Sequence, residues 1–556
     1  MRVVSFNVCH DSSVCSYVDG NIEFYCKEER LSRIKRDKEP YKSLELFYEQ
    51  KFGKIDHFFY LTPSDDSPDD FRYSSIFIKK KFGVNLENCP FSHHECHASL
   101  AFYNSGFEEC LVFVVDRNGS ICFGPNNENL ARESESIYKC SYPSNIDPIY
   151  KSFWICDENK KYVVKKSLDF HYGLDVNVNN PFSIVKVYEA ATTLIGQNAL
   201  ENGKTMGLAS YGEDLEYESL FLNGSPIRNY FSSLDIPTSE EDSSCFYGYE
   251  DLITKDINKE NYQFYANKSK HVQLETQKET LRLISKFVDD TKVKNVCIVG
   301  GYGLNVVANN FYIKNLPDVN FYFEPLSDDS GITIGASMLK YRRMSGDDKI
   351  STQKDNFYHF YKEDNIEIPG IKKTVEDIVD LLIDQKIIAL FDGSPEAGPR
   401  ALGHRSLLFD PRNKDGKDIV NVLKKREWYR PFAGIILEKE FDKYFYTLGL
   451  QRSEFMTINF ECKPDTKNFV PSIVHVDNTC RIQTVSEKDG FIFKLLNLFY
   501  EKTGCPMLLN TSFNLAGDPL VHSIGDALNF IDKVSDTKIF SGVYFVENNI
   551  LTSALN

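Results

Sequence analysis

A polar stretch without hydrophobic periodicity, Ser345 to Asp355, interrupts this chain of 556 residues. A chain of that length is too long for one hydrophobic core, so two domains or more are expected. Beyond the stretch, residues 374–385 have the apolar periodicity of a helix with a start signal at Thr374, and a predicted strand follows at 387–391. We therefore predict a first domain at 1–345, a linker at 346–370 and a second, α+β domain at 371–556.

Three predicted strands of the first domain each end in a small or polar turn. The strands are residues 3–8, 111–115 and 296–299, and the turns that follow contain HDSS, DRNGS and GG. This arrangement favours a split α/β domain that holds a nucleotide between its two halves. Three ordinary surface hairpins are the alternative interpretation.

The composition narrows the class of protein. With 42% hydrophobic and 26% charged residues the chain is typical of a globular protein, and its formal charge of -16 argues against a surface that holds a nucleic-acid backbone. The N-terminus lacks the pattern of a signal peptide, and apolar runs such as Cys110 to Val115 are too short for a membrane span. The 14 cysteines include no CxxC pair, which favours reduced thiols in a cytoplasmic protein.

The segment HHECHAS contains three histidines at helical spacing. His93 and His97 are four residues apart, and His94 and His97 are three apart, so either pair would share one helical face. Two imidazoles need further ligands, and Asp116 and Asp329, which opens DSGITIGAS, are the candidates. Mixed imidazole and carboxylate ligation suits Fe(II), Mn(II) or Zn(II). A surface helix with incidental histidines is the alternative.

Two glycine-rich segments, residues 201–212 and 300–305, have the character of nucleotide-binding loops. Backbone amides approach a phosphate or an adenine closely only where Cβ is absent. Neither segment matches a Walker loop or a dinucleotide fingerprint. The predicted nucleotide contacts are Asn118, Gly119, Lys204, Gly300, Gly301 and Asn305.

The segment between residues 400 and 430 is strongly basic. It contains nine Lys or Arg residues against four acidic residues, a local charge of +5 in a chain whose total is -16. Such a cluster, interleaved with Pro399, Gly403 and Trp428, favours recognition of a small phosphorylated anion. Arg481 and the run 508–514 would complete this pocket, and a merely solvated basic face is the alternative.

Together these motifs resemble the O-carbamoyltransferase family whose members modify antibiotics and nodulation factors. The resemblance covers nearly the whole chain and runs through HDSS, EERLSRIK, HHECHASLAFYNSGF, VVDRNGS, NGKTMGLASYG, GGYGLN, DDSGITIGAS, GPRALGHRSLLFDPR, KKREWYRPFAGIIL, HVDNTCRIQTV and TGCPMLLNTSFNLAGDPL. It implies an actin- and sugar-kinase-like first domain. For the second domain it implies the YrdC-like fold of threonylcarbamoyl-adenylate synthases.

The resemblance also implies roles for individual residues and a reaction. It places a divalent metal, Fe(II) or Mn(II), on His93, His97, Asp116 and Asp329. It places carbamoyl phosphate near His10, Lys35, Arg400, Lys425, Arg430 and Arg481. By analogy, carbamoyl phosphate is cleaved to carbamate, carbamate attacks ATP (with Mg) to give carbamoyl-AMP, and an acceptor hydroxyl displaces AMP. A homodimer is also expected.

Two positions depart from the family pattern. Arg117 stands where the family has a glycine after Asp116, which alters a predicted phosphate contact. Leu515 and Ala516 follow NTSFN where many relatives carry a basic residue, which removes a predicted anion contact.

Other functions and acceptors fit the sequence less well. The lack of paired CxxC motifs disfavours a hydrogenase-maturation enzyme, the negative charge disfavours a tRNA-modifying fusion, and a non-catalytic actin-like scaffold would leave the basic segment unused. The charge favours a soluble sugar-type acceptor. The alternative acceptor is a hydroxymethylated pyrimidine in a nucleotide or in DNA, for which residues 149–166 would provide a basic rim of Lys151, Lys160, Lys161, Lys165 and Lys166.

Overall fold

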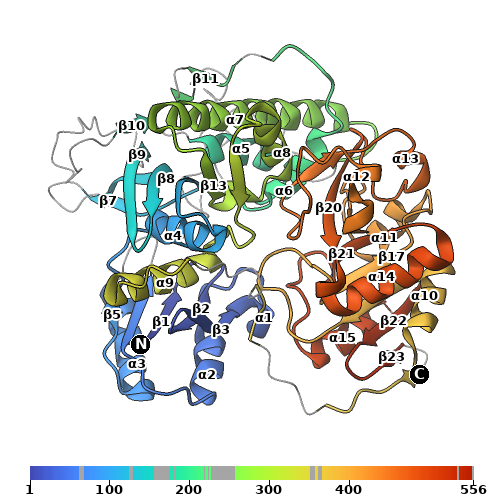
Figure 1. Cartoon of the computed structure of the whole chain (residues 1–556), viewed down its shortest axis with the longest axis horizontal. Helices are drawn as coiled ribbons and strands as arrows, with labels where there is room; N and C mark the ends of the chain where they lie inside the picture. Colours follow the sequence, from blue (N-terminus) through green and yellow to red (C-terminus); the bar gives the residue numbers. More distant parts are fainter. Residues whose placement is uncertain are drawn as a thin grey trace. The chain divides into compact units, whose positions relative to one another are not determined.

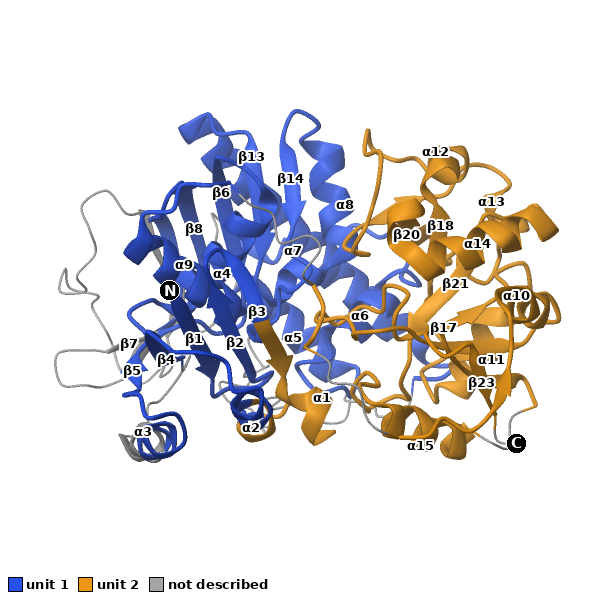
Figure 2. Cartoon of the chain, turned by 60° about the horizontal axis from the view of Figure 1, so that its bottom comes forward, with its two compact units in different colours: residues 1–23, 38–40, 44–354 blue, residues 24–37, 41–43, 355–556 orange. Residues whose placement is uncertain are grey.

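The computed structural model describes residues 1–61, 68–123, 129–155, 175–179, 183–217, 219–222, 225–226, 257–350, 357–360, 366–534 and 538–553. The chain forms two compact units (Figure 2). Unit 1 comprises residues 1–23, 38–40 and 44–354, and unit 2 comprises residues 24–37, 41–43 and 355–556. Both units contain helices and β-sheet.

The unit boundary near residue 354 lies inside the segment predicted as a linker. One N-terminal segment, however, belongs to unit 2 and not to unit 1. The sequence-based boundary assigns residues 24–37 to the first domain, whereas they cluster with unit 2. Arg33 explains the difference, because its guanidinium donates to the backbone carbonyls of Leu520 (2.7 Å) and Pro519 (2.9 Å). Contacts between residues so far apart in sequence leave no local pattern from which they can be predicted.

Unit 1 contains two larger sheets (Figure 1). The first has the order β3-β2-β1-β4-β5, where β1 is Arg2–Asn7, β2 Ser13–Val18, β3 Asn21–Lys27, β4 His57–Leu61 and β5 Glu87–Asn88. The second has the order β10-β9-β8-β6-β13-β14, where β6 is Glu109–Val115, β8 Asn129–Ser141, β9 Asn145–Ile155, β10 Asp175–Asn179, β13 Asn295–Val299 and β14 Asn320–Phe323. Strand β7 (Ile121–Phe123) pairs with β8, and β11 (Phe221–Leu222) pairs with β12 (Ser225–Pro226).

The pairing of β6 with β13 positions two of the predicted turns. The strands are parallel and in register from Leu111 beside Val296 to Val114 beside Val299. The carboxyl ends of parallel strands lie at the same edge of a sheet, which is where α/β folds bind ligands. The turns that begin at Asp116 and Gly300 therefore lie side by side.

The helices of the first 350 residues are α1 Glu28–Ser32, α2 Tyr41–Glu49, α3 Pro68–Phe82, α4 His93–Ser105, α5 Ile184–Leu194, α6 Asn202–Ala209, α7 Tyr262–Thr291, α8 Val306–Asn315 and α9 Ile332–Ser345. Helix α4 is almost wholly buried and ends at Gly106, whose φ of 77° favours glycine. It packs against α9, and the backbones approach closely at Gly335. Across the part of the chain that is described, no helix is long and apolar enough to cross a lipid bilayer.

Unit 2 is built on one sheet with the order β15-β23-β22-β16-β17-β21-β18-β20-β19 (Figure 1). The strands are β15 Ile371–Lys372, β16 Ile387–Phe391, β17 Ser406–Phe409, β18 Ala433–Leu437, β19 Asn459–Glu461, β20 Thr479–Val485, β21 Met507–Ser512, β22 Phe540–Phe545 and β23 Ile550–Thr552. The helices are α10 Val375–Ile383, α11 Gly416–Leu423, α12 Phe441–Tyr444, α13 Thr466–Phe469, α14 Gly490–Thr503 and α15 Ile524–Val534. The predicted helix after Thr374 is confirmed, because Thr374 and Asp377 form a capping box at the start of α10.

Gly335→Ala should destabilise unit 1. A Cβ at this position would meet the carbonyl oxygen of Cys96 and would lie 2.8 Å from the amide nitrogen of Leu100, so α4 would have to move away from α9. Overpacking of this kind costs about 1–3 kcal/mol, and thermal unfolding followed by circular dichroism should show a lower midpoint. In the control Gly203→Ala, on α6, no atom lies within 4 Å of the added Cβ, and the midpoint should be unchanged or higher. Equal midpoints for the Gly335 variant and the native protein would contradict the close packing.

Candidate functional site

Four buried side chains of unit 1 form a cluster that is suited to a metal ion. They are His93 and His97 on α4, Asp116 directly after β6, and Asp329 in the short 3-10 helix η4 (Asp329–Gly331) before α9. The side chain of Ser92 caps α4, so the helix begins at the first of these histidines. One nitrogen or oxygen from each side chain lies within 4.8 Å of the other three.

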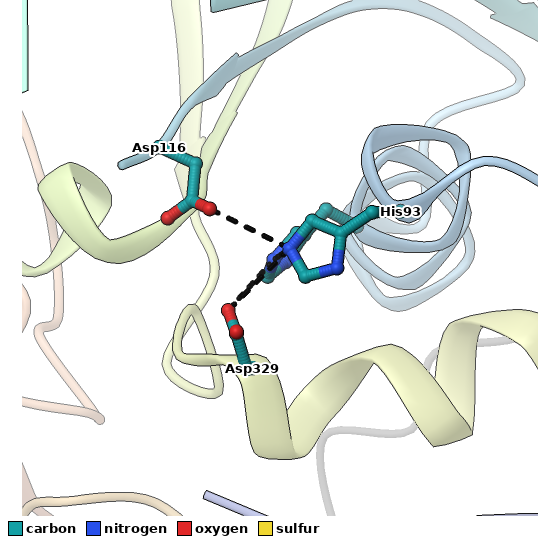
Figure 3. Close-up of side chains that lie close together, drawn as sticks. His93, Asp116 and Asp329 are labelled. Carbon is teal, nitrogen blue, oxygen red and sulfur yellow. Dashed lines mark hydrogen bonds and ion pairs between the residues drawn. The ribbon is translucent and has the colours of Figure 1, made fainter. Parts of the chain in front are cut away.

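Imidazole Nε2 atoms and carboxylate oxygens face each other in this cluster. Nε2 of His93 lies 3.5 Å from an oxygen of Asp116 and 3.5 Å from an oxygen of Asp329 (Figure 3). Nε2 of His97 lies 3.5 Å from the same Asp329 oxygen and 3.2 Å from Nε2 of His93. The four side chains thus point toward a common centre from α4, from the end of β6 and from the start of α9.

The electrostatics of the cluster favour a cation at this centre. Burial lowers the pKa of His93, but Asp329 and Asp116 outweigh that effect and raise the pKa to about 10. Burial raises the pKa values of both carboxyls, but the imidazoles outweigh it and hold them below their usual range. Nδ1 of His93 and Nδ1 of His97 are buried without a hydrogen-bond partner among the described residues. Two nitrogens and two carboxylates are a fitting ligand set for a divalent transition metal, which would replace protons on the imidazoles.

His94 faces away from the cluster. Of the two histidine pairs that the sequence left open, the structure therefore places His93 and His97 in the cluster. Nδ1 of His94 lies 2.8 Å from the hydroxyl of Ser136 on β8, and burial lowers the pKa of the imidazole to about 3. Its ring fills the space beside Gly119, where a Cβ would lie 2.6 Å from Nε2. His94 is a neutral, buried residue. The absence of a side chain at Gly119 leaves room for its ring.

His10 adjoins the cluster from the turn between β1 and β2. Nδ1 lies 3.1 Å from a carboxylate oxygen of Asp11, and Nε2 lies 3.5 Å from the Asp329 oxygen that faces away from the other histidines. Burial lowers the pKa of His10, but Asp329 and Asp11 outweigh it and raise the pKa to about 9. In the metal-free protein His10 is therefore a cation at neutral pH, and it is suited to hold an anion.

Two of the predicted nucleotide loops border the cluster. Gly300 has a φ of 86°, and a Cβ there would lie 2.5 Å from the carbonyl oxygen of Val115. The amide of Gly301 donates to Asp116 over 3.0 Å. The side-chain oxygen of Asn118 is buried without a hydrogen-bond partner among the described residues, so it is available to a ligand.

Two further predicted nucleotide contacts have structural partners. The ammonium of Lys204 donates to Gln197 (2.6 Å) and pairs with Glu201 (3.1 Å). Asn305 caps α8 and exchanges hydrogen bonds with Gln273 on α7.

Arg117, which departs from the family pattern, belongs to a buried ionic group that the sequence did not predict. Its Nε lies 2.7 Å from Glu189 on α5, and the ammonium of Lys186 lies 3.3 Å from the other oxygen of that carboxylate. Burial lowers the pKa of Lys186 to about 8, partly offset by Glu189. The arginine that replaces glycine is thus tied to a neighbouring helix.

Unit 2 contains a cluster of four arginines that we call the arginine cluster: Arg400, Arg426, Arg430 and Arg481. Desolvation lowers the pKa of Arg426, and the other three arginines lower it further, while Glu427, which pairs with Arg430 at 3.5 Å, partly offsets them. Desolvation also lowers the pKa of Arg481, to about 10, with a contribution from Arg430. Nε of Arg481 is buried and has no hydrogen-bond partner within the described ranges. Mutually repelling, partly desolvated arginines with an unused donor favour an anion at this place.

Strand register explains why distant arginines meet. Ala433 at the start of β18 lies between Arg481 on β20 and Asn510 on β21. Arg430 comes three residues before that position, and Arg426 reaches within 3.5 Å of the Thr511 hydroxyl on β21. The run 508–514 therefore borders the cluster.

Several other basic residues of this segment have structural contacts. Arg405 is fully buried and donates to the carbonyls of Asp392 and Gly393, and Arg412 pairs with Asp410 at 2.6 Å. The ammonium of Lys424 donates to the Asn514 carbonyl over 2.8 Å. These contacts account for part of the +5 charge that the sequence shows.

Lys425, predicted to bind carbamoyl phosphate, is exposed, and its φ of 54° places it in the turn after α11. Arg426 lies in the arginine cluster instead, and the sequence did not single it out. Helix α11 ends at Leu423, so the helical pattern no longer tells which of the next residues points inward. Lys35 belongs to unit 2 and lies near Lys424, whose pKa is lowered by burial, by two arginines and by Lys35.

Only one lysine of the basic rim predicted for a DNA acceptor, Lys151, lies in the described residues, and it has a partner within the protein. The ammonium of Lys151 forms an ion pair with Glu133, and both side chains are largely buried. Lys160, Lys161, Lys165 and Lys166 lie outside the described residues.

His97→Ala should weaken Mn(II) binding by about 100-fold or more, because it removes a nitrogen from the cluster and leaves two carboxylates with one imidazole. Isothermal titration with Mn(II) and metal analysis of the purified protein would measure the effect. His94→Asn is the matched control and should retain the metal, because His94 contacts Ser136 instead of the cluster. Equal Mn(II) affinity for the His97 variant and the native protein would contradict the ligand set.

The chain is similar to several curated proteins over most of its length. It is 28% identical to an uncharacterised protein of Methanocaldococcus jannaschii over 85% of this chain and 76% of that protein. It is 25% identical to Nodulation protein NolNO of Sinorhizobium fredii over 93% of this chain and 76% of that protein. A shorter region, 40% of this chain and 39% of the relative, is 31% identical to Nodulation protein U of Bradyrhizobium diazoefficiens.

Among solved structures, full-length HypF in its phosphate- and nucleotide-bound form matches with a TM-score of 0.38 and 14% identity. The match covers 62% of this chain and 56% of the HypF chain, so it spans about half of that protein. A likeness at this TM-score does not assign a fold to either unit.

Two family descriptions match the chain in the order of its units. Residues 69–338 match the family described as Carbamoyltransferase N-terminus, and residues 379–547 match the one described as Carbamoyltransferase C-terminus. The chain therefore belongs to the carbamoyltransferase family.

Proposed function

We propose that the protein is an ATP-dependent O-carbamoyltransferase that works through carbamoyl-AMP. The observation that carries the proposal is the arginine cluster of unit 2, in which partly desolvated guanidinium groups lie together and Nε of Arg481 is buried without a partner among the described residues. Because the chain belongs to the carbamoyltransferase family, carbamoyl phosphate is the anion that we expect the arginine cluster to bind. The actin- and sugar-kinase-like fold of unit 1 and the YrdC-like fold of unit 2 are parts of the same proposal.

The first step belongs to the arginine cluster. The guanidinium groups bind the phosphate of carbamoyl phosphate and stabilise the charge that grows on it as it leaves. Water adds to the carbamoyl carbon and the bond from that carbon to the phosphate oxygen breaks, which gives carbamate and inorganic phosphate. Lys35 is a further cation for this step, and the exposed Lys425 is not needed for it.

The second step belongs to the turns at the end of β6 and β13. The turns that contain Asn118 and Gly300 would lie beside ATP and its Mg, and the side chain of Asn118 would contact them. A carbamate oxygen attacks the α-phosphorus of ATP, and pyrophosphate leaves. His10, which lies beside Asp11 and Asp329, would hold the carbamate or the phosphate.

The third step takes place beside His93, His97, Asp116 and Asp329. Fe(II) or Mn(II) held by these side chains would polarise the carbamoyl oxygen and lower the pKa of an acceptor hydroxyl. The hydroxyl oxygen attacks the carbamoyl carbon, the bond to the AMP phosphate oxygen breaks, and the hydroxyl proton is released to solvent.

Arg481→Ala should lower phosphate release from carbamoyl phosphate by about 100-fold or more, the usual effect of removing one donor to a developing anion. A colorimetric phosphate assay measures the rate, and the control is Lys425→Ala. Because Lys425 is exposed and Arg426 takes its place in the cluster, the control should keep the native rate. A large loss with Lys425→Ala and none with Arg481→Ala would reverse the assignment.

Asp329→Asn should have the opposite effect. It lies in the metal cluster of unit 1, so phosphate release should continue while the transfer of the carbamoyl group stops. Mass spectrometry of acceptors incubated with enzyme, ATP and carbamoyl phosphate should show a gain of about 43 Da with the native protein only. Loss of phosphate release in this variant would contradict a separate site for each step.

A further inference from the structure

Two amide side chains of unit 2 hold the loop that follows Arg400. The side-chain nitrogen of Asn510 on β21 donates to the backbone carbonyl of Ala401 over 2.9 Å, and that of Gln483 on β20 donates to the carbonyl of Leu402 over 2.8 Å. Consecutive Cα atoms are about 3.8 Å apart. The two amide groups therefore lie under the same short piece of chain, although β18 separates their strands.

Each of these amide groups has an acceptor atom that the protein does not use. Because the nitrogens donate to carbonyl oxygens, the orientation of both amide groups is fixed, and the remaining atoms are Oδ1 of Asn510 and Oε1 of Gln483. Both oxygens are buried without a hydrogen-bond partner among the described residues, and the two side chains are only 1% and 4% exposed. A buried carbonyl oxygen without a donor is costly, so both atoms favour a ligand with N–H or O–H groups.

The strand register places these oxygens beside the arginine cluster. Arg481 on β20 and Asn510 on β21 are each paired with Ala433 on β18, so the three side chains stand on the same face of the sheet. Gln483 follows Arg481 by two residues and therefore points to that face as well. Between the guanidinium and the Asn510 amide stands only the small side chain of Ala433.

The hydrogen-bonding atoms on this face require a ligand with both acceptors and donors. Nε of Arg481 is a buried donor, and Asn510 and Gln483 offer two buried acceptors, all three without a partner among the residues that are described. A phosphate dianion carries only acceptors, so it would satisfy the arginine and leave both amide oxygens unpaired. A carbamoyl amino group, like the amide group of a side chain, supplies two N–H donors. Carbamoyl phosphate therefore combines the groups that this face requires.

We propose that Asn510 and Gln483 bind the amino group of carbamoyl phosphate and select a carbamoyl group over other acyl groups. The inference rests on the proposed function and names two specificity-determining residues for its first step. The phosphate lies on the arginine cluster, and each N–H of the amino group donates to one amide oxygen. An acetyl group has nearly the same shape, but its methyl group would leave both buried oxygens without a donor.

The first test compares carbamoyl phosphate with acetyl phosphate on the full-length protein. A site that hydrogen-bonds a polar group of its substrate rejects an analogue without that group by about 10⁴-fold. We expect kcat/KM for phosphate release to be at least about 100-fold higher for carbamoyl phosphate, because the arginine cluster still binds the phosphate of both compounds. An enzyme-coupled phosphate assay, corrected for the rate without enzyme, measures both values. Equal values would overturn the proposal.

Two variants each remove one amide oxygen at nearly constant volume. Gln483→Met and Asn510→Leu should each lower the ratio of kcat/KM for carbamoyl phosphate to that for acetyl phosphate about 10-fold or more, because a methyl group no longer strands the oxygen. A merely displaced loop would slow both substrates alike and keep the ratio. Gln385→Met is the matched control, because Gln385 binds Asp410 and Asn413, and it should keep the native ratio. A native ratio in both of the first two variants would contradict the assignment.

Stable analogues separate this inference from the proposed function. Phosphonoacetamide and 2-oxopropylphosphonate replace the bridging oxygen by a methylene group, and they differ from each other only in an amino or a methyl group. Isothermal titration of the native protein should show at least about 10-fold tighter binding of phosphonoacetamide. Equal affinities would mean that water satisfies the two oxygens, and the inference would fall. These measurements need no variant, so they decide it even where a substitution in the interior prevents folding.

The two sets of measurements fail in different ways. If the native protein bound phosphonoacetamide selectively but released no phosphate from carbamoyl phosphate, the proposed first step would be wrong and the assignment of Asn510 and Gln483 would stand. If it released phosphate equally well from carbamoyl phosphate and acetyl phosphate, the first step would stand and the assignment would be wrong.

Discussion

The burial of two carboxylates beside two imidazoles is the interaction on which the first unit depends. An unpaired carboxylate in a protein interior costs several kcal/mol, so Asp116 and Asp329 require a positive partner. In the metal-free protein the protonated imidazole of His93 provides it, which is why the pKa of His93 is raised to about 10. A metal ion would take over this role and would release protons, so its binding should strengthen as the pH rises. Three elements, α4, β6 and α9, meet at this point, and the close contact at Gly335 holds two of them together.

The second unit has the opposite imbalance of charge. Its arginine cluster is partly desolvated, and each guanidinium lowers the pKa of its neighbours. The strand register that brings Arg481 beside Ala433 keeps these charges together despite their repulsion. One unit thus holds a site that needs a cation, and the other holds a site that needs an anion. In the proposed function, the first site would hold the metal and the second would hold the phosphate group of carbamoyl phosphate.

Local patterns in the sequence predicted the elements and the motifs well, and long-range contacts limited the rest. The helix after Thr374 and the turns after β6 and β13 follow from periodicity and from glycine, which act over a few residues. Helical spacing could not choose between His93 and His94, because the choice depends on Ser136, which lies on another strand. The same reason explains why Lys425 was predicted to bind the anion and Arg426 was not. Both residues follow the end of α11, where the tertiary fold and not the helical periodicity determines which side chain points inward. The transfer of residues 24–37 to unit 2 depends on Arg33 and carbonyls that are hundreds of residues away.

The assignment of residues 24–37 to unit 2 bears on the proposed chemistry. A single stretch of chain, from β1 to the residues after α1, contributes His10 to the metal cluster of unit 1 and Lys35 to the basic surroundings of unit 2. Strand β3 begins in one unit and ends in the other, so the two units are joined by a strand as well as by the segment near residue 354. In the proposed function, one continuous stretch of chain therefore contributes a residue near the site that consumes carbamate and a residue near the site that forms it.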